Sequence, residues 1–334
     1  MLPPAEDGDS DRVVAFAARA LGSRLQLTVR LPERDDAGHR AAAHAWDEVR
    51  EEFDQVDRAM SRFRDDSELT GLNRLAGSGR VLRVSWRLRR ALAAIDRAGR
   101  ATGGRFDASV LGTLERIGER GASLGPAHRS ATPAGAAVAD WQTGDRQPSL
   151  VHAPAVPVDL GGIGKGLALR WARDRALRVL PPGAGLLLDA GGDLVAEGSA
   201  AGPGWPVGIE DPVAANPADA DPLVVVDVAG GAVATSSVRV RNWRGPDGAP
   251  VHHLVDPRTG APARTGLVAV TVAWPDPAWA EVWSKALFLA GRREIGDEAR
   301  ARGLAAWWVD DGGHLGMTPD ARLRTTWARE DRLG

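Results

Sequence analysis

Three short stretches of the sequence hold residues whose types and spacing suit chemistry on a phosphate group. The first is VDLGGIGKGLA (158–168), in which an apolar run ends at Asp159 and glycines flank Lys165. Glycines between a strand and a helix let the backbone approach a ligand, and the helix N-terminus offers free N–H groups and a partial positive charge. With the charge of Lys165 added, this stretch suits an anionic ligand, although a tight turn with a solvated lysine explains it equally well.

The glycine-rich stretch fits neither of the two common nucleotide-binding formulas. A Walker loop would need glycine at position 159 and Ser or Thr at 166, where the chain has Asp159 and Gly166. A dinucleotide fingerprint that starts at Gly162 and Gly164 would need a third glycine at 167, where the chain has Leu167. The sequence therefore predicts neither a P-loop nucleotide hydrolase nor a Rossmann dinucleotide site.

The second stretch, AVATSS (232–237), carries three hydroxyl groups. We expect Thr235, Ser236 and Ser237 to follow the end of a strand. Because a hydroxyl both donates and accepts hydrogen bonds, this run adds weight to the interpretation of the glycine-rich stretch as part of an anion site.

The third stretch, VHHLVDPRTG (251–260), combines two histidines with an aspartate. A neutral histidine is suited to accept a proton near pH 7. Strand alternation would place His252 and His253 on opposite faces, so at most one of them faces a given site. Neither histidine stands in a metal-ligand pattern, and the residues that begin at Asp256 (DPRTG) are also good β-turn chemistry.

The elements that position these stretches are predicted from the spacing of apolar residues. Strands and helices do not alternate regularly, so we expect an α+β fold of mostly antiparallel sheets with packed helices rather than a doubly wound sheet. The predicted helices span 40–61, 84–101, 132–142, 167–180 and 278–290. The predicted strands include 25–31, two strands in 186–198, 267–274 and a hairpin in 305–318.

Composition excludes several classes of function. Of 334 residues, 43% are hydrophobic and 26% charged, and the net charge is -2, so no basic field favours nucleic acid or an anionic membrane. The absence of cysteine excludes disulfides and thiolate chemistry, and the absence of tyrosine excludes a tyrosyl acid.

We predict a disordered lead-in over 1–12 and a single domain over 13–334. The polar N-terminus and the lack of about 18 consecutive apolar residues lead us to expect a cytoplasmic protein without membrane insertion.

A series of motifs in order resembles the ApbE family of flavin transferases. The resemblance runs from about residue 19 to 320, and its specificity lies in the ordered set. The motifs are SELTGLNRL, GGRFDASV, DLGGIGKG, LDAGGDLVAEG, WPVGIEDP, VATSS, HHLVDPRTGAP and AEVWSKALFLAG. The resemblance implies an FAD-binding α+β fold, usually with magnesium. It also implies transfer of FMN from FAD to a Ser or Thr of an acceptor flavoprotein, with release of AMP.

The resemblance also implies roles for individual residues. His253 matches the histidine near the pyrophosphate and would be the catalytic base, with Asp256 orienting it or holding the turn. Asn73 and Asp107 match positions of the cofactor pocket, although either residue also suits a turn or a helix cap. The residues expected to line the FAD site are Asn73, Asp107, Asp159, Gly161, Gly162, Gly164, Lys165, Gly166, Thr235, Ser236, Ser237 and His253.

The helix over 278–290 departs from the family pattern. Relatives resemble ADALATAL there, and the Asp and Thr, four residues apart, ligate magnesium. This chain reads AEVWSKAL, with Glu281 and Lys285 at those two positions. In one interpretation, Glu281 and loop carbonyls near Gly164 still bind Mg²⁺. In a second, the Lys285 ammonium occupies part of the metal site. In a third, Glu281 and Lys285 form an ordinary i,i+4 ion pair. An aspartate expected after the glycine-rich stretch is also replaced, by Arg170.

Three functions follow from these patterns. The leading hypothesis is an FAD:protein FMN transferase that modifies an acceptor flavoprotein. The altered metal pair motivates the alternative of a non-catalytic FAD-binding protein. A third hypothesis is an FAD pyrophosphatase that yields FMN and AMP. The sequence does not name the acceptor.

Overall fold

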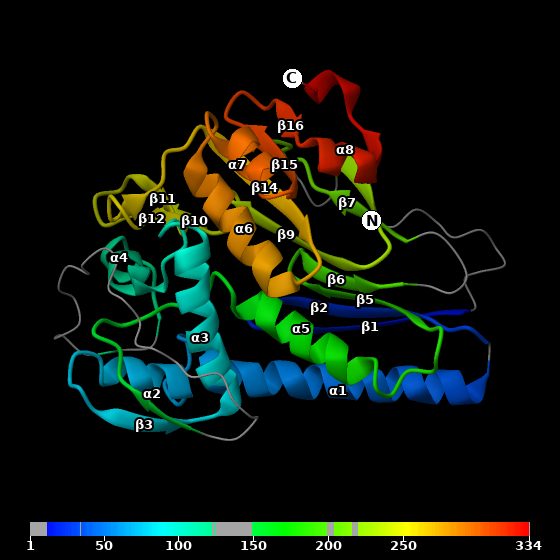
Figure 1. Cartoon of the computed structure of the whole chain (residues 1–334), viewed down its shortest axis with the longest axis horizontal. Helices are drawn as coiled ribbons and strands as arrows, with labels where there is room; N and C mark the ends of the chain where they lie inside the picture. The colour runs from blue at the N-terminus through cyan, green and yellow to red at the C-terminus, as the bar shows by residue number, and fades with distance from the viewer. Residues whose placement is uncertain are drawn as a thin grey trace. The chain divides into compact units, whose positions relative to one another are not determined.

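The computed structural model describes residues 12–33, 35–121, 124, 149–198, 204–215 and 220–333. It confirms the predicted α+β fold, since the described strands pair in antiparallel sheets that are packed with helices (Figure 1). The predicted lead-in, apart from Arg12, and the predicted helix over 132–142 lie outside the described residues. None of the described helices is long and apolar enough to cross a membrane.

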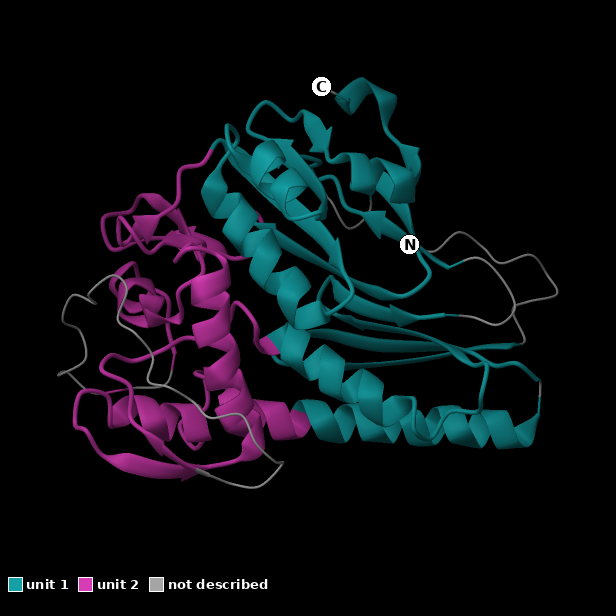
Figure 2. Cartoon of the chain, in the orientation of Figure 1, with its two compact units in different colours: residues 1–53, 165–237, 266–334 teal, residues 54–164, 238–265 magenta. Residues whose placement is uncertain are grey.

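The chain divides into two compact units, each built from separate pieces of sequence (Figure 2). Unit 1 comprises residues 1–53, 165–237 and 266–334, and unit 2 comprises residues 54–164 and 238–265. The glycine-rich stretch is therefore divided, because unit 2 ends at Gly164 and unit 1 resumes at Lys165. The single domain expected over 13–334 stays a prediction.

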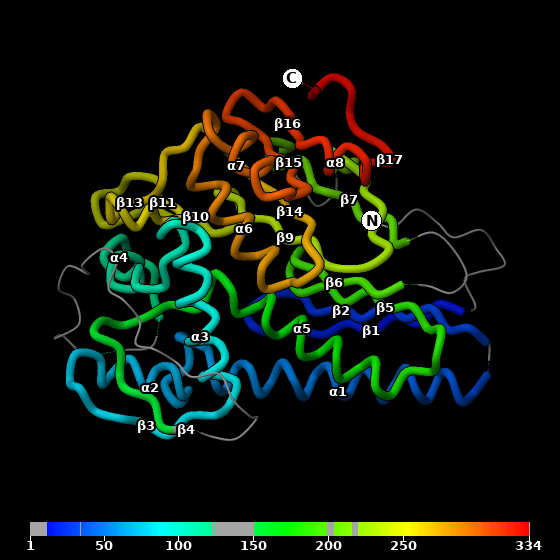
Figure 3. Tube along the Cα trace, viewed as in Figure 1, coloured from blue at the N-terminus to red at the C-terminus, as the bar shows by residue number. Residues whose placement is uncertain are grey.

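An eight-stranded antiparallel sheet forms the centre of unit 1. Strands distant in sequence become neighbours in it, as β2 and β5 do along the trace (Figure 3). In spatial order the strands are β1 (Val13–Ala20), β2 (Ser23–Arg30), β5 (Gly185–Ala190), β6 (Asp193–Glu197), β9 (Gly231–Ser237), β14 (Leu267–Trp274), β15 (Ala305–Asp310) and β16 (Leu315–Met317). The strands predicted near 25–31, in 186–198, at 267–274 and in the hairpin 305–318 are all confirmed.

A smaller sheet and several helices complete unit 1. The smaller sheet has the order β17 (Thr325–Ala328), β8 (Val224–Val228), β7 (Trp205–Ile209). Its side chains share a hydrophobic core with the large sheet that includes the fully buried Trp205 and Trp307. The helices are α5 (Gly164–Ala176), which starts one residue before the unit, α6 (Pro277–Ala290), α7 (Ile295–Ala301) and α8 (Pro319–Arg324), with a 3₁₀ turn, η4 (Glu330–Arg332), near the end.

Helix α6 covers β9 and β14 of the large sheet. It begins where its sequence predicts: the Asp276 side chain accepts a hydrogen bond from Trp279 N–H as the N-cap, and Pro277 occupies the first turn. It ends at Gly291, whose φ of 81° lies in the left-handed region that glycine adopts easily. These signals fix which residues of α6 face the sheet.

The contact between α5 and α6 requires a glycine at position 166. A Cβ on Gly166 would lie 2.5 Å from both the Cα of Ala278 and the carbonyl oxygen of Pro277. The start of α5 is consequently packed directly against the backbone of α6. Helix α5 begins at Gly164 and ends at Ala176, three residues earlier at its start than the predicted 167–180.

Unit 2 is built around helices and short hairpins. Helix α1 (Asp36–Met60) runs from unit 1 into unit 2, which begins at Asp54. The other helices are α2 (Glu68–Arg74), α3 (Trp86–Ala101) and α4 (Leu111–Arg116), preceded by the 3₁₀ turn η2 (Ala108–Val110). The strand pairs are β3 (Val81–Val84) with β4 (Ser149–His152), β10 (Asn242–Arg244) with β11 (Pro250–His252), and β12 (Val255–Asp256) with β13 (Ala261–Pro262).

Candidate active site

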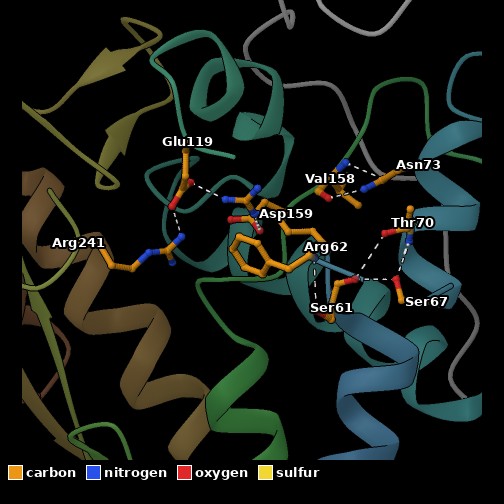
Figure 4. Close-up of polar contacts among 10 residues, drawn as sticks. Ser61, Arg62, Ser67, Thr70, Asn73, Glu119, Val158, Asp159 and Arg241 are labelled. Carbon is orange, nitrogen blue, oxygen red and sulfur yellow. Dashed lines mark hydrogen bonds and ion pairs between the residues drawn. The ribbon is translucent and has the colours of Figure 1, made fainter. Parts of the chain in front are cut away.

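Asn73 fixes the chain at the start of the glycine-rich stretch. Its Nδ2 donates to the carbonyl oxygen of Val158 at 2.8 Å, and its Oδ1 accepts from the N–H of Val158 at 2.9 Å (Figure 4). The Asn73 side chain is completely buried. Its amide therefore pairs with the backbone as a neighbouring strand would, and this predicted FAD contact is seen here to position Val158, the residue just before Asp159.

The carboxylate of Asp159 is held by Arg62 and folds back over the loop. Arg62 Nε lies 3.2 Å from Asp159 Oδ1. The backbone N–H of Asp159 donates to the carbonyl oxygen of Ala108 at 2.7 Å. A Cβ on Gly161 would lie 2.9 Å from Asp159 Oδ2, so only glycine leaves room for the carboxylate. Asp159 and Gly161 together thus determine the path of the loop before α5.

His253 has a defined orientation in unit 2. Its backbone N–H donates to the carbonyl oxygen of Arg241 at 3.2 Å, and its ring Nδ1 lies 3.3 Å from the same oxygen. Because a carbonyl oxygen only accepts, Nδ1 carries the proton in this contact, and Nε2 of the neutral ring keeps its lone pair. His253 is therefore arranged to accept a proton at Nε2.

His252 has different surroundings from its neighbour. It is the last residue of β11, and its Nε2 lies 3.1 Å from the carbonyl oxygen of Ala263. Burial lowers the pKa of His252 below its usual value, against the opposing effect of that hydrogen bond. The two histidines consequently contact different carbonyls, Ala263 for His252 and Arg241 for His253.

Two of the predicted aspartates of unit 2, Asp107 and Asp256, hold turns. Asp107 caps η2, accepting from Ser109 N–H at 2.8 Å and from Ser109 Oγ at 2.6 Å. Asp256 accepts from the backbone N–H, Nε and Nη2 of Arg258 at 2.9, 3.1 and 3.0 Å. Burial would raise the pKa of Asp256, but the hydrogen bonds from Arg258 outweigh it and lower that pKa. Both carboxylates therefore make the contacts of a residue that holds a turn, which was one of the two roles that the sequence allowed.

Lys165 is joined to the large sheet of unit 1 by Asp193. Its ammonium forms an ion pair with Asp193 Oδ2, and Asp193 Oδ1 accepts from the N–H of Thr235 at 3.0 Å. The Asp193 side chain is almost buried, at 5% exposure, whereas Lys165 remains 30% exposed. The ammonium is thus held by a buried carboxylate, while part of the lysine side chain remains exposed.

Glu281 points from α6 to the start of α5. Its Oε2 accepts from the N–H of Gly166 at 2.8 Å, and its side chain is buried. Burial and the nearby negative charge of Asp193 raise the pKa of Glu281 to about 7, although Lys165 and Lys285 act in the opposite direction. The ionisation of Glu281 is therefore coupled to one negative charge and two positive charges, those of Asp193, Lys165 and Lys285.

The three hydroxyls of 235–237 do not form one cluster. They lie within β9, so the prediction that they follow a strand is wrong. Adjacent strand residues point to opposite faces: Ser236 Oγ lies 2.8 Å from Ser284 Oγ in α6, whereas Thr235 Oγ1 lies 2.9 Å from Thr271 Oγ1 on the other face. Thr235 is exposed and Ser237 is buried.

The family of the chain follows from a match over most of its length. The model of the ApbE family matches residues 21–308. The chain belongs to the ApbE family. This confirms the resemblance that the ordered motifs gave.

Characterised ApbE proteins agree with the chain in sequence and fold. The FAD:protein FMN transferase of Salmonella typhimurium is 30% identical over 287 residues, covering 80% of this chain and 77% of that protein. The apo structure of flavinyl transferase ApbE from Pseudomonas stutzeri has a TM-score of 0.74 at 26% identity, covering 95% of this chain and 98% of that one. The ApbE protein of Thermotoga maritima has a TM-score of 0.76 at 24% identity, covering 94% and 100%.

The residues at the positions predicted to hold Mg²⁺ fit this ion poorly. Mg²⁺ needs several oxygen ligands in octahedral geometry. Here Glu281 accepts from Gly166 N–H, both oxygens of Asp193 are engaged, and Lys285 adds a positive charge beside them. Among the described residues no three His, Cys, Asp or Glu side chains form a group that would hold a metal ion. The second cation of the replaced pattern, Arg170, binds Asp276 at 2.5 Å.

Sequence reasoning missed three charged residues of the site. Asp193, the partner of Lys165, stands directly after the glycine turn in LDAGGDL, and this position was its available signal. Arg62 and Glu119 contact each other and are joined to Asp159 and Arg241. No local pattern marks Arg62 or Glu119, because their partners are distant in sequence.

Proposed function

We propose that this ApbE protein is an FAD:protein FMN transferase. The observation that carries the proposal is family membership over 21–308, joined to a His253 ring whose Nδ1 is engaged by a carbonyl. Its relatives with that name, at 30% and 28% identity over about four-fifths of this chain, support the same activity. The substrates are FAD and an acceptor flavoprotein, and AMP is the second product.

The proposed reaction is a phosphoryl-type transfer in which no protein nucleophile is required. A Ser or Thr hydroxyl of the acceptor attacks the phosphorus on the FMN side of FAD. The bond from that phosphorus to the bridging oxygen breaks, and AMP leaves with that oxygen. The hydroxyl proton passes to Nε2 of His253, the ring nitrogen other than the one that contacts the Arg241 carbonyl.

Protein cations supply the counter-charge in this proposal. Lys165, 30% exposed and held by Asp193, would bind an oxygen of the pyrophosphate. Lys285 replaces the hydroxyl ligand of the family and would add a second positive charge. Mg²⁺ held by Glu281 and the carbonyl of Gly164 remains the competing prediction, and the engagement of Glu281 by Gly166 speaks against it.

Incubation with an acceptor tests the transferase directly. The protein, FAD and a purified acceptor flavoprotein domain should give a fluorescent acceptor band on a denaturing gel, with one equivalent of AMP released. His253→Ala should abolish the band while leaving the protein folded. His252→Ala is the matched control, since His252 binds another carbonyl.

The same experiment separates the two rival functions, of which the altered Glu281–Lys285 pair motivates the non-catalytic FAD-binding protein. Free FMN and AMP without a labelled acceptor would identify an FAD pyrophosphatase. Intact FAD that stays bound for hours, with and without added Mg²⁺, would identify an FAD-binding protein. Either result, obtained with several acceptors, would overturn the transferase assignment.

A further inference from the structure

A row of four charged side chains joins the glycine-rich stretch to His253 within unit 2. The guanidinium of Arg241 binds Glu119, Glu119 lies 2.5 Å from Arg62, and Arg62 Nε lies 3.2 Å from Asp159 (Figure 4). Three of the side chains are buried or nearly so, with 4% of Arg62, 9% of Glu119 and 12% of Asp159 exposed. Two positive charges balance two negative charges, so the row is neutral.

Each end of the row meets a residue of the proposed reaction. At one end, the carbonyl oxygen of Arg241 accepts a hydrogen bond from the backbone N–H of His253 and lies 3.3 Å from the ring Nδ1 of the same residue. At the other end, Asp159 follows Val158 and lies against Gly161 in the loop before α5. The row therefore connects the proposed base with the proposed anion-binding loop.

Stability alone is a weak reason for such a row. Buried ion pairs are often no more stabilising than apolar residues of the same size, because both charges lose their hydration. Within the described part of the chain, Arg62 Nη1 and Nη2 and Glu119 Oε2 have no hydrogen-bond partner, so their contact is an ion pair of poor hydrogen-bond geometry. A role in positioning groups is therefore a better reason for the row than stability.

We propose that Glu119 is a positioning residue of the transfer reaction. It holds the Arg241 side chain, and through the Arg241 backbone it keeps the proton of the neutral His253 ring on Nδ1. It also binds Arg62, which fixes Asp159 and the loop. This role rests on the proposed FMN transfer, in which Nε2 of His253 receives the proton.

The test compares two buried glutamates that each bind arginine. Glu119→Gln should lower kcat for FMN transfer by roughly tenfold with little change in the KM for FAD, because misplacing a reacting group by a fraction of an ångström is costly. Glu52→Gln is the control, since Glu52 is also buried and binds Arg175 at 3.1 Å in unit 1. It should reduce stability to a similar extent but leave kcat unchanged.

A readout that needs no activity separates the two proposals. Nitrogen NMR of the imidazole rings should show His253 with its proton on Nδ1 in the wild type and a mixture of tautomers in Glu119→Gln. A kcat within twofold of the wild type, or an unchanged His253 tautomer, would overturn the positioning role. A wild type without transferase activity but with the expected tautomer shift would instead overturn only the proposed function.

Unit 1 carries a second feature, a cavity lined by arginines. The cavity has a volume of about 620 Å³, within the usual range for small-molecule sites, and lies among α7, β15, β16 and α8. Four arginines and a single carboxylate line it, together with apolar side chains. The charged residues are Arg292, Arg293, Arg300, Arg322 and Asp297, and the large apolar ones are Trp308, Leu315, Met317 and Leu333.

Two of the four arginines have a counter-charge among the described residues and two do not. Arg292 lies 3.2 Å from Asp310, and Arg300 lies 2.5 Å from Asp297. In the part of the chain that the structure describes, Arg293 and Arg322 form no ion pair. Arg292 also lies 3.6 Å from Asp311, so the two positive charges without an ion-pair partner among the described residues are those of Arg293 and Arg322. Together they match in magnitude the charge of a phosphate monoester dianion.

The apolar part of the lining is closely packed. A Cβ on Gly316 would lie 2.3 Å from the indole of Trp308, so the glycine backbone is pressed against the ring. Trp308 is only half-buried and lines the cavity with Met317. We infer that this cavity binds a small phosphate monoester with a planar apolar body, with Arg293 and Arg322 on the phosphate and Trp308 against the body.

Calorimetry with phenyl phosphate tests this site. Saturable binding is expected, with an affinity at least tenfold lower in Arg293→Ala/Arg322→Ala. Arg324→Ala, on the same helix as Arg322 but outside the cavity, should bind as the wild type does. Inorganic phosphate and phenol should each bind more weakly than phenyl phosphate.

Three results would contradict the cavity site. One is the lack of saturable binding below about 1 mM. Another is equal binding by the double variant and the wild type, which would place the ligand elsewhere. The third is binding of phenol or phosphate alone as tightly as phenyl phosphate, which would remove the reason for assigning a monoester.

Discussion

The Oε2 atom of Glu281 lies 2.8 Å from the backbone nitrogen of Gly166, which joins the middle of one helix to the first turn of another. Glu281 stands at a position where the family resemblance predicts a magnesium ligand, yet its Oε2 accepts a hydrogen bond from the chain itself. Gly166 has no space for a side chain because the backbone of α6 lies against it. The fold therefore ties together two positions that the sequence presents as separate motifs.

The raised pKa of Glu281 predicts a pH-dependent effect of Glu281→Gln. A carboxyl with a pKa of about 7 in the folded protein and 4.5 unfolded binds protons more tightly when folded. The free energy of unfolding of the wild type should then fall as pH rises from about 4.5 to 7 and level off above. Glutamine does not titrate and so removes this loss. Between pH 4 and pH 9, the free energy of unfolding of the variant should therefore rise by up to about 3 kcal/mol relative to that of the wild type.

Urea unfolding at several pH values measures this difference. Any constant offset from a changed hydrogen bond with Gly166 cancels, because only the change with pH is compared. A difference between variant and wild type that is the same at every pH would show that Glu281 does not titrate in this range.

The lysine at position 285 predicts that metal is not required for activity. Wild-type FMN transfer should persist within twofold in EDTA, since ammonium groups supply the counter-charge. Glu281→Asp/Lys285→Thr introduces the carboxylate and hydroxyl that the family resemblance predicts at these positions, and this double variant should become dependent on Mg²⁺. Calorimetry should detect Mg²⁺ binding in the double variant only. A strict Mg²⁺ requirement of the wild type would contradict this prediction.

Replacing Asn73 should cost considerable stability. Asn73→Ala leaves the buried N–H and C=O of Val158 without partners, and each such group costs about 1–3 kcal/mol. We expect the free energy of unfolding to fall by roughly 2–4 kcal/mol. Asn242→Ala is the control: its side chain also donates to backbone oxygens but is exposed, so the loss should stay below about 1 kcal/mol. Equal effects would show that burial of the Asn73 pair is not decisive.

Replacing two helical glycines by alanine should change the stability of the protein in opposite directions. In an open helix position, Gly→Ala stabilises by about 0.5–1 kcal/mol. A Cβ on Gly71 in α2 would lie 3.8 Å from its nearest neighbour, a methyl group of Leu82, so Gly71→Ala should stabilise. Gly166→Ala would place its methyl 2.5 Å from the backbone of α6 and should destabilise by about 1–3 kcal/mol. Thermal unfolding distinguishes the two signs, and a stabilising Gly166→Ala would refute the close packing of α5 on α6.

The sequence by itself determined the elements and the family. The apolar spacing of 267–274 and 278–290 is local, and local spacing is enough to define β14 and α6. The family followed from the order of short motifs, each of which is also local. The turn chemistry of Asp256 was visible for the same reason, since its partner Arg258 is two residues away.

Only the tertiary structure decided what the charged residues contact. Lys165 meets Asp193, and Arg62 meets Glu119 and Asp159, across separations that no periodicity encodes. Strand pleating likewise separated Thr235 from Ser236, although they are adjacent in sequence. Electrostatic partners depend on which elements pack together and on how deeply they are buried, and both are properties of the folded chain.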